Sequence, residues 1–292
     1  MHKAGFINII GKPNAGKSTL MNALVGEKMS IITPKAQTTR HRIIGIVNHD
    51  DFQMVFSDTP GIIKPKYGLH ERMMDFVKSS MHDADVMVLV VDLKDPDPEL
   101  EDIADKLVKR NCPLIILLNK VDAVQTAVIT EQVDIYSKLF KPDALFPISA
   151  LMKANLEPVM MQILNYLPDS PPFFDKEELT DKPERFFIAE IIREKIFLNY
   201  KKEIPYSTEV VIESFKEEKN ILRIAANILV ERKSQKPIVI GRGGEKLKRV
   251  GTHSREDIEA FLGKKVFLEL YVKVVEDWRN KDSHLKNFGY RQ

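Results

Sequence analysis

Short apolar runs alternate with amphipathic segments of helical length in the first part of the chain. Residues 5–10 predict a buried strand, and a helix is expected to begin at Lys17. Further apolar runs of five or six residues follow at 86–91, 114–118 and 144–148. Runs of this kind are typical of strands buried on both faces of a mostly parallel sheet. The pattern therefore predicts an α/β domain with helices on both faces of the sheet.

Two other apolar runs, residues 42–47 and 52–56, flank a cluster of turn-forming residues. We expect them to form an antiparallel hairpin. The sheet domain should end near Leu167, because the Pro-Asp-Ser-Pro-Pro sequence that follows cannot continue a helix. The predicted organisation is a first domain at 1–170, a linker at 171–184 and a second domain at 185–292.

The second domain has a different order of elements. An amphipathic helix is expected over residues 184–199, followed by strands at 208–215 and 221–231. A basic helix should begin near Glu245, and a last strand should cover residues 265–275. This order predicts an α+β domain.

The composition agrees with two ordinary globular domains. At 292 residues the chain exceeds the size that one hydrophobic core usually serves, and 43% of its residues are hydrophobic. Its one cysteine allows no internal disulfide and favours a reducing compartment. The N-terminus shows no signal-peptide pattern, and no apolar run approaches the ~20 residues of a membrane span. We expect a cytoplasmic protein.

A phosphate-binding loop joins the first strand to the first helix. It matches G-x-x-x-x-G-K-[ST] in the required strand–loop–helix context. Its backbone N–H groups can surround phosphate oxygens, Lys17 should reach the outer phosphates, and Ser18 should bind Mg²⁺. The predicted contact residues are Gly11, Lys12, Pro13, Asn14, Ala15, Gly16, Lys17, Ser18 and Thr19.

The tetrad Asn119-Lys120-Val121-Asp122 indicates that the base is guanine. It follows the strand at 114–118, and ligands bind at the carboxyl ends of strands in open α/β sheets. The Asp122 carboxylate can accept hydrogen bonds from guanine N1–H and the exocyclic amine, whereas adenine would leave the charge unpaired. Ser149 and Ala150, which follow the strand at 144–148, could present N–H groups to the guanine carbonyl.

The sequence Asp58-Thr59-Pro60-Gly61 ends the strand at 52–56 and predicts the metal and γ-phosphate contacts. Asp58 would hold Mg²⁺ through a water, and the Gly61 N–H would meet the γ-phosphate. Between these motifs, a threonine of Gln37-Thr38-Thr39-Arg40 can complete the metal shell only when a γ-phosphate is present. We choose Thr39 over Thr38. The predicted metal ligands are Ser18, Thr39 and Asp58, and the predicted catalytic residues are Lys17, Thr39 and Gly61.

Positive charge is concentrated in the second domain. Residues 1–200 have a balance of −4, whereas residues 201–292 have a balance of +6. Such a patch is either a solvated face or the binding surface of a polyanion. The tetrad Gly241-Arg242-Gly243-Gly244 favours the second interpretation, because a G-x-x-G loop before a basic helix can clamp the backbone of single-stranded RNA. The predicted RNA-binding residues are Gly241, Arg242, Gly243, Gly244, Lys246, Lys248 and Arg249.

These motifs, in this order, resemble the Era family of GTPases. The resemblance covers the whole chain and extends to the closing Asn287-Phe288-Gly289-Tyr290. It implies a P-loop GTPase domain followed by a type II KH domain over about residues 185–280. It also implies that a hydrophobic residue is normal at Ile62, where Ras-like enzymes place a water-orienting glutamine. Because isoleucine cannot orient water, we expect slow intrinsic GTP hydrolysis.

The family resemblance implies a biological setting as well. It implies GTP and GDP as ligands, binding to the 3′ end of 16S rRNA, and a role in assembly of the small (30S) ribosomal subunit. It further implies Mg²⁺ as cofactor, with Asn14 matching a position that helps bind K⁺ in some relatives. Peripheral association with the cytoplasmic face of the membrane is implied too, and we expect a monomer.

Two other functions are compatible with parts of the pattern. One is a GTPase acting on a different RNA, such as tRNA during modification, although such a protein would normally have an added catalytic domain. The other is a constitutive RNA-binding protein whose nucleotide domain is only structural. The complete set of predicted Mg²⁺ and guanine contacts argues against the second alternative.

Overall fold

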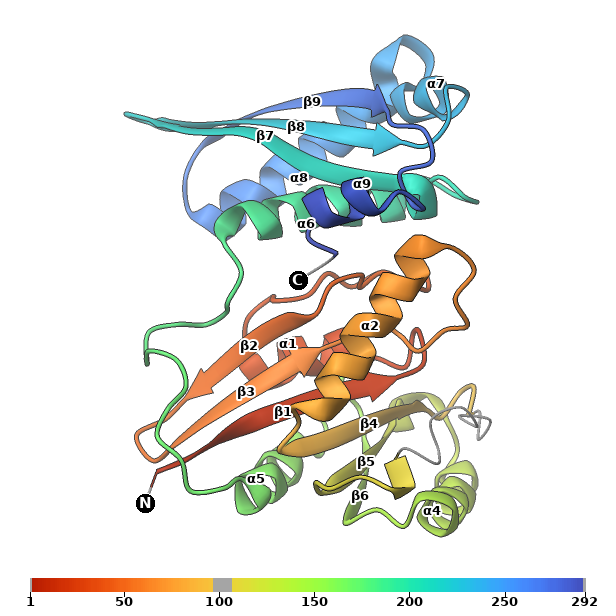
Figure 1. The fold of residues 1–292 in the computed structure, drawn as a ribbon, viewed down its shortest axis with the longest axis vertical. Helices are drawn as coiled ribbons and strands as arrows, with labels where there is room; N and C mark the ends of the chain where they lie inside the picture. Colours follow the sequence, from red (N-terminus) through yellow and green to blue (C-terminus); the bar gives the residue numbers. More distant parts are fainter. Residues whose placement is uncertain (1, 97–106, 291–292) are drawn as a thin grey trace. The chain divides into compact units, whose positions relative to one another are not determined.

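The computed structural model describes residues 2–96 and 107–290 (Figure 1). The chain forms two compact units. The first contains residues 1–30, 39–64 and 73–181, and the second contains residues 31–38, 65–72 and 182–292. Two short segments from the first third of the sequence therefore belong to the second unit.

The first unit is built on a six-stranded sheet with the order β2-β3-β1-β4-β5-β6. All neighbours are parallel except β2 and β3, which pair antiparallel as the predicted hairpin. The prediction of a mostly parallel sheet is confirmed. The strands are β1 (Lys3–Gly11), β2 (Ile43–Asn48), β3 (Phe52–Asp58), β4 (Val86–Asp92), β5 (Leu114–Asn119) and β6 (Ala144–Ile148).

Helices cover both faces of this sheet, with α2 in front of it and α1 behind it in Figure 1. The helices with described bounds are α1 (Lys17–Val25), α2 (Gly68–His82), α4 (Thr126–Phe140) and α5 (Leu156–Tyr166), with a short 3₁₀ turn at Val121–Ala123. The strands β4 and β5 are apolar and buried along nearly their whole length, as expected for a sheet covered on both sides. Their carboxyl ends place the nucleotide motifs at one edge of the sheet.

The segment after α5 packs along the first unit. Gln53 of β3 is fully buried, and its side-chain oxygen accepts hydrogen bonds from Phe173 N (2.7 Å) and Phe174 N (3.0 Å). On the neighbouring strand β2, Ile46 N donates to Leu179 O at 2.9 Å. The bond from Ile46 satisfies a backbone N–H on the outer edge of β2, and the Gln53 side chain satisfies two backbone N–H groups of the later segment.

The second unit is built on a three-stranded sheet with the order β7-β8-β9. The β7 and β8 strands are antiparallel, and β8 and β9 are parallel. The connection from β8 to β9 runs through two helices, which the parallel pairing requires. The elements are α6 (Glu184–Asn199), β7 (Thr208–Glu218), β8 (Ile221–Val230), α7 (Gln235–Ile240), α8 (Glu245–Leu262), β9 (Val266–Val274) and α9 (Asp282–Asn287), with 3₁₀ turns at Pro205–Ser207 and Arg242–Gly244.

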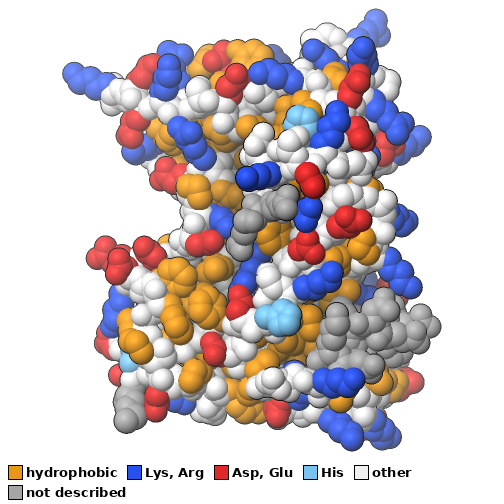
Figure 2. Space-filling model, in the orientation of Figure 1, with side chains coloured by type: hydrophobic (Ala, Val, Ile, Leu, Met, Phe, Trp, Pro, Cys, Tyr) orange, Lys and Arg blue, Asp and Glu red, His pale blue; other side chains and the backbone are white. Residues whose placement is uncertain are grey.

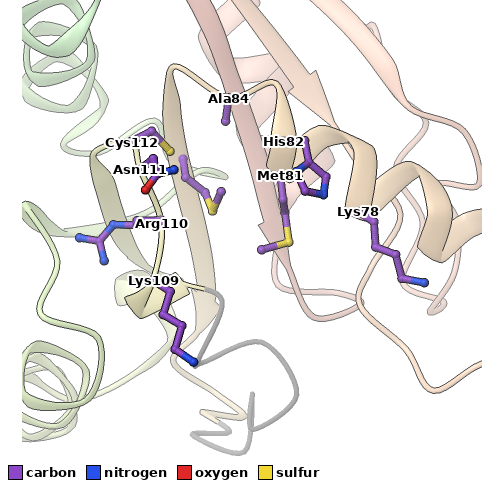
Figure 3. Close-up of a pocket in the computed structure, with 9 residues that line it drawn as sticks. Lys78, Met81, His82, Ala84, Lys109, Arg110, Asn111 and Cys112 are labelled. Atoms are coloured by element: carbon purple, nitrogen blue, oxygen red, sulfur yellow. The ribbon is translucent and has the colours of Figure 1, made fainter.

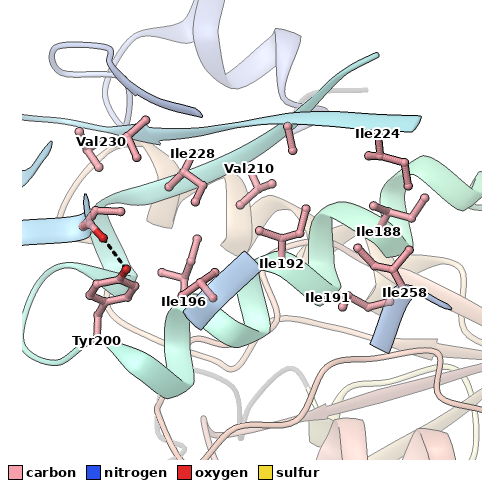
Figure 4. Close-up of a cluster of buried hydrophobic side chains, with 14 of the residues drawn as sticks. Ile188, Ile191, Ile192, Ile196, Tyr200, Val210, Ile224, Ile228, Val230 and Ile258 are labelled. Atoms are coloured by element: carbon pink, nitrogen blue, oxygen red, sulfur yellow. Dashed lines mark hydrogen bonds between the residues drawn. The ribbon is translucent and has the colours of Figure 1, made fainter. Parts of the chain in front are cut away.

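One apolar core joins the helices of the second unit to one face of its sheet (Figure 4). Ile188 and Ile192 of α6 face Ile224 and Ile228 of β8, and all four are buried. At the end of α6, the Tyr200 hydroxyl donates to Val239 O at 2.6 Å and so ties α6 to α7. The predicted helix–strand order of this domain is confirmed.

The surface of both units is mixed in charge. The face shown in Figure 2 has many Lys and Arg side chains on the second unit, interspersed with acidic ones. Within the described ranges, no helix combines the length and the apolar character needed to cross a bilayer.

Candidate functional site

The phosphate-binding loop lies between the end of β1 at Gly11 and the start of α1 at Lys17. Gly16 has a φ of +98°, and a Cβ at this position would stand 2.2 Å from Asn119 Nδ2. Glycine is therefore needed for both the backbone conformation and the close approach. This contact brings the loop against the residue that begins the guanine motif.

Lys17 is almost completely buried at the base of this loop, with 6% of its surface exposed. Its amine donates hydrogen bonds to the backbone oxygens of Gly11 (3.1 Å) and Lys12 (2.8 Å). Burial lowers the pKa of Lys17 to about 8, although the nearby Asp58 carboxylate opposes the shift. An anionic ligand bound here would therefore strongly favour the charged form of the Lys17 amine.

Ser18, Thr39 and Asp58 meet in one cluster. The Ser18 hydroxyl donates to Asp58 Oδ2 at 2.7 Å and lies 2.9 Å from the Thr39 hydroxyl oxygen. Asp58 is fully buried, and its Oδ1 makes no hydrogen bond within the described residues. Burial raises the pKa of Asp58, while Lys17 and the Ser18 hydroxyl oppose that shift.

The chemistry of this cluster fits Mg²⁺. Two hydroxyls and a carboxylate are hard oxygen ligands, and the unpartnered Asp58 Oδ1 can accept from a metal-bound water. The neighbouring Thr38 hydroxyl is engaged elsewhere. It lies 2.6 Å from the Thr33 hydroxyl oxygen and donates to Lys35 O at 2.8 Å. The geometry therefore favours Thr39 over Thr38 as a ligand.

The segment after β3 lies against the phosphate-binding loop. A Cβ at Gly61 would stand 2.7 Å from Pro13 N, and Ile62 N donates to Gly11 O at 3.1 Å. The Thr59 hydroxyl donates to Ile9 O at 2.8 Å and fixes the start of this segment. The Ile62 side chain is partly buried against the apolar core. No polar group at position 62 can orient a water molecule.

The guanine motif connects three loops through side-chain hydrogen bonds. Asn119 Nδ2 donates to Ala15 O at 2.8 Å, and Asn119 Oδ1 accepts from Ala150 N at 2.9 Å. The Ser149 hydroxyl donates to Asp122 Oδ1 at 2.5 Å. The predicted phosphate, guanine and Ser149-Ala150 residues therefore lie together at one edge of the sheet.

Asp92 lies beside the predicted nucleotide residues, although the sequence patterns did not reveal it. It ends β4 and forms an ion pair with Lys120, whose amine also donates to Asn14 O at 2.9 Å. The pair holds the Lys120 stem across the phosphate-binding loop. The available signal was a carboxylate directly after a buried apolar run, at the edge where ligands bind.

The G-x-x-G loop of the second unit has the backbone that its glycines predict. Gly241, Gly243 and Gly244 have φ values of +77°, +60° and +81°. Apart from the adjoining residues, no described atom lies within 4 Å of where a Cβ would stand at Gly243 or Gly244, so a ligand backbone can approach there. The cations of this region are exposed, namely Arg242, Lys246, Lys248 and Arg249.

Apolar side chains beside this loop were not predicted as part of the site. Ile240 and Leu247 flank the loop, and Leu268 and Leu270 come from β9; all are partly buried against the core. A Cβ at Gly251 would stand 3.5 Å from Leu270 Cδ1, so α8 approaches β9 closely. Ile240 and Leu247 therefore place partly exposed apolar side chains directly before and soon after the basic loop.

A cavity of about 550 Å³ in the first unit lies away from these motifs (Figure 3). It is found at the amino ends of β4 and β5, between Met81 and His82 of α2 and the segment 109–112. The Arg110 guanidinium forms an ion pair with the Asp143 carboxylate at 2.7 Å. Burial raises the pKa of the Cys112 thiol, which favours its protonated form. The nucleotide residues are at the opposite ends of these strands.

Comparison with known proteins finds family models that match both parts of the chain. A family model described as a 50S ribosome-binding GTPase matches residues 6–120, and a KH domain model matches residues 203–279. GTPase Era of Alkaliphilus metalliredigens is 43% identical over 292 residues, covering 99% of each chain. GTPase Era of Geobacter sp. strain M21 is 44% identical over 290 residues, covering 99% of this chain and 98% of its own.

Two solved structures are similar along nearly the whole chain. Era in complex with MgGDPNP and nucleotides 1506–1542 of 16S ribosomal RNA has a TM-score of 0.95, 41% identity and full coverage of both chains. A variant of Aquifex aeolicus Era bound to GDP and AlF₄⁻ has a TM-score of 0.94 and 41% identity, covering 99% of this chain and all of its own. The fold and site define a P-loop GTPase with a C-terminal KH domain. With relatives above 40% identity over its full length, the chain belongs to the Era family of GTPases.

Proposed function

We propose that this GTPase is a Mg²⁺-dependent switch that binds the 3′ end of 16S rRNA and acts in assembly of the 30S ribosomal subunit. The solved Era complex with nucleotides 1506–1542 of 16S ribosomal RNA supports the choice of RNA. From the family resemblance we also propose a cytoplasmic monomer with peripheral contact to the membrane, and K⁺ binding near Asn14.

The nucleotide would bind at the edge of the sheet where the motifs meet. The N–H groups of residues 12–19 would surround the phosphates, and Lys17 would neutralise their outer charge. Ser18, Thr39 and Asp58 would hold Mg²⁺, which supplies charge stabilisation for phosphate oxygens. Asp122 would accept the two guanine donors while the Ser149 and Ala150 N–H groups face the guanine carbonyl.

Thr39 and Gly61 would distinguish GTP from GDP. Each would have its partner only when a γ-phosphate is present, so their segments would be held with GTP and released with GDP. Hydrolysis should be slow, well under ~1 s⁻¹ without a partner, because the apolar side chain of Ile62 cannot position the attacking water.

The RNA would bind over the G-x-x-G loop. The loop glycines allow close approach of the sugar-phosphate backbone, and the exposed cations beside them would neutralise phosphates. The apolar side chains Leu247, Leu268 and Leu270 would pack against bases. The observation that most supports this proposal is the open space around Gly243 and Gly244 next to four exposed cations.

Filter binding of a single-stranded RNA with the 3′-terminal sequence of 16S rRNA tests the proposal. The double change Arg242→Asp and Gly243→Asp should abolish binding, because two carboxylates would face the phosphates. The matched double change Lys248→Ala and Arg249→Ala should weaken binding modestly and flatten its salt dependence by roughly one unit per lost phosphate contact. Normal binding by the aspartate variant would show that the RNA site is elsewhere.

The alternative functions can be separated by two further measurements. A constitutive RNA-binding protein would show no GTP turnover above background, and its RNA affinity would ignore the nucleotide. A GTPase acting on another RNA would give crosslinks in cells to that RNA instead of the 3′ end of 16S rRNA.

A further inference from the structure

Two segments of the second unit adjoin nucleotide residues in the sequence. Residues 31–38 directly precede Thr39, and residues 65–72 begin four positions after Gly61. Both Thr39 and Gly61 are the residues expected to respond to a γ-phosphate. Thr39 and Gly61 are therefore joined by only a few residues to segments that pack within the second unit.

The first of these segments is anchored on the helix α6. The Lys35 amine donates to the backbone oxygens of Phe197 and Tyr200, which belong to the last turn of α6 and its cap. Ile32 N donates to Glu194 Oε1 at 3.3 Å. A lysine at the end of a helix satisfies its terminal carbonyls and opposes the negative end of the helix dipole.

The second segment is anchored on residues 277–282, which follow β9. Leu69 N donates to Arg279 O at 2.8 Å, and Arg72 pairs with Asp282 at 2.8 Å. A Cβ at Gly68 would stand 3.0 Å from Arg279 O. The segment and the chain after β9 are therefore in direct contact, with no room for a side chain between them.

The Arg279 side chain makes contacts in two directions. Its guanidinium lies over the Tyr67 ring, 4.5 Å from the centroid, and forms an ion pair with Glu231. Both members of the ion pair are mostly buried, with side-chain exposures of 18% and 10%. A stacked and paired arginine of this kind holds its neighbours in a fixed geometry.

Glu231 leads directly to the RNA-binding region. It follows the last residue of β8, and its backbone N–H donates to the Gln235 side-chain oxygen at 2.9 Å. Gln235 begins α7, the helix that ends at the G-x-x-G loop. The contacts Tyr67–Arg279–Glu231–Gln235 therefore join the segment after Gly61 to the helix before that loop.

We propose that Arg279 is a positioning residue that couples the nucleotide state to RNA binding. It touches neither ligand site and acts through Tyr67 on one side and Glu231 on the other. The inference rests on the proposed function, because it requires that Gly61 responds to the γ-phosphate and that RNA binds at the G-x-x-G loop. If RNA is bound more tightly with GTP than with GDP, the ratio of the two affinities measures the coupling.

The test is the RNA dissociation constant of the full chain with GDP and with GDPNP, both with Mg²⁺. The probe is the single-stranded RNA with the 3′-terminal sequence of 16S rRNA. We define the coupling ratio as the RNA dissociation constant with GDP divided by that with GDPNP. Arg279→Ala should lower this ratio by ~3-fold or more, as expected for loss of a partly buried cation–π contact. GDP affinity without RNA should change by less than ~2-fold, since the nucleotide contacts remain.

Arg223→Ala is the matched control. Arg223 also lies over an aromatic ring, that of Phe267 at 4.9 Å, and pairs with Glu218 at 2.9 Å. Replacing Arg223 with alanine should leave the ratio of the two RNA dissociation constants unchanged. Tyr67→Phe should keep the coupling because it keeps the ring, whereas Tyr67→Ala should lose it. The Tyr67 pair of variants leaves Arg279 and Glu231 intact, so it tests the inference even if Arg279→Ala folds poorly.

The outcomes separate this inference from the proposed function. No RNA binding by the unmodified chain in either state would refute the proposed function. RNA binding with equal affinity in both states would leave that function standing and overturn the coupling. A loss of RNA affinity in Arg279→Ala that is equal in both states, or an equal effect of Arg223→Ala, would show that Arg279 is merely structural.

Discussion

Raising the pH should weaken nucleotide binding through the titration of one residue, Lys17. Its amine is buried beside the phosphate-binding loop, and its pKa is lowered from 10.5 to about 8. Bound phosphates favour the charged form and should bring the pKa back toward its ordinary value or above it. Binding at pH 8 and above therefore requires the uptake of a proton.

The size of this effect follows from the pKa difference. Between pH 8 and 10.5 the unfolded chain binds more protons at Lys17 than the folded nucleotide-free chain, so folding stability rises with pH in that window. Below pH 8 the charged buried amine costs about 3 kcal/mol of stability. For binding, the charged fraction of Lys17 falls about tenfold from pH 7 to pH 9, and the dissociation constant of GDP should rise ~10-fold.

Isothermal titration calorimetry at pH 8, in two buffers of different ionisation enthalpy, measures the proton uptake directly. We expect about half a proton per GDP bound, since half of Lys17 is then neutral in the free protein. Guanine N1 titrates only at the alkaline end of the range, so pH 8 isolates the lysine. Lys138→Met, an exposed change on α4, should preserve the uptake. Zero uptake together with a constant affinity from pH 7 to 8.5 would refute this reasoning.

Three other outcomes are expected from the same site. Asp122→Asn should shift the preference from guanine toward xanthine nucleotides in a competition assay, whereas the unmodified chain should favour GTP over ATP by at least ~10³-fold. Thr39→Ala should remove any Mg²⁺-dependent preference for GDPNP over GDP in fluorescence titration, and Thr38→Ala should retain it because Thr38 bonds Thr33 and Lys35 instead. Ile62→Ala should leave GTP affinity nearly intact in equilibrium binding, since this side chain packs on the core.

The gathering of the predicted nucleotide residues at one edge of the sheet could be foreseen from the sequence, because the contacts within each motif are local. A phosphate-binding loop works through consecutive backbone N–H groups, so its residues must be adjacent in the sequence. The guanine motif could be placed because parallel strands end at the same edge of a sheet. The structure shows what holds the motifs together, since the Asn119 side chain makes hydrogen bonds to the backbones of both Ala15 and Ala150.

Contacts between distant residues could not be predicted in this way. Asn8 lies in a run interpreted as a buried apolar strand, yet its amide donates to Asp83 Oδ1 at 2.8 Å. Gln53 is fully buried because it bonds Phe173 and Phe174, about 120 positions later. A single sequence shows such polar residues in apolar runs but does not identify their partners. The Arg279–Tyr67 contact could not be predicted for the same reason.

Close backbone approaches occur at successive points along the route from the guanine motif to the second unit. Gly16 meets the Asn119 amide, Gly61 meets Pro13, and Gly68 meets Arg279 O, each at 3.0 Å or less from where a Cβ would stand. A packed contact without slack moves its partner when it moves, whereas a solvated gap absorbs the displacement. The glycines thus allow the guanine loop, the phosphate loop and the segment after Gly61 to respond together. In the coupling proposed above, these contacts would pass the effect of one phosphate group to an RNA-binding loop that the phosphate does not touch.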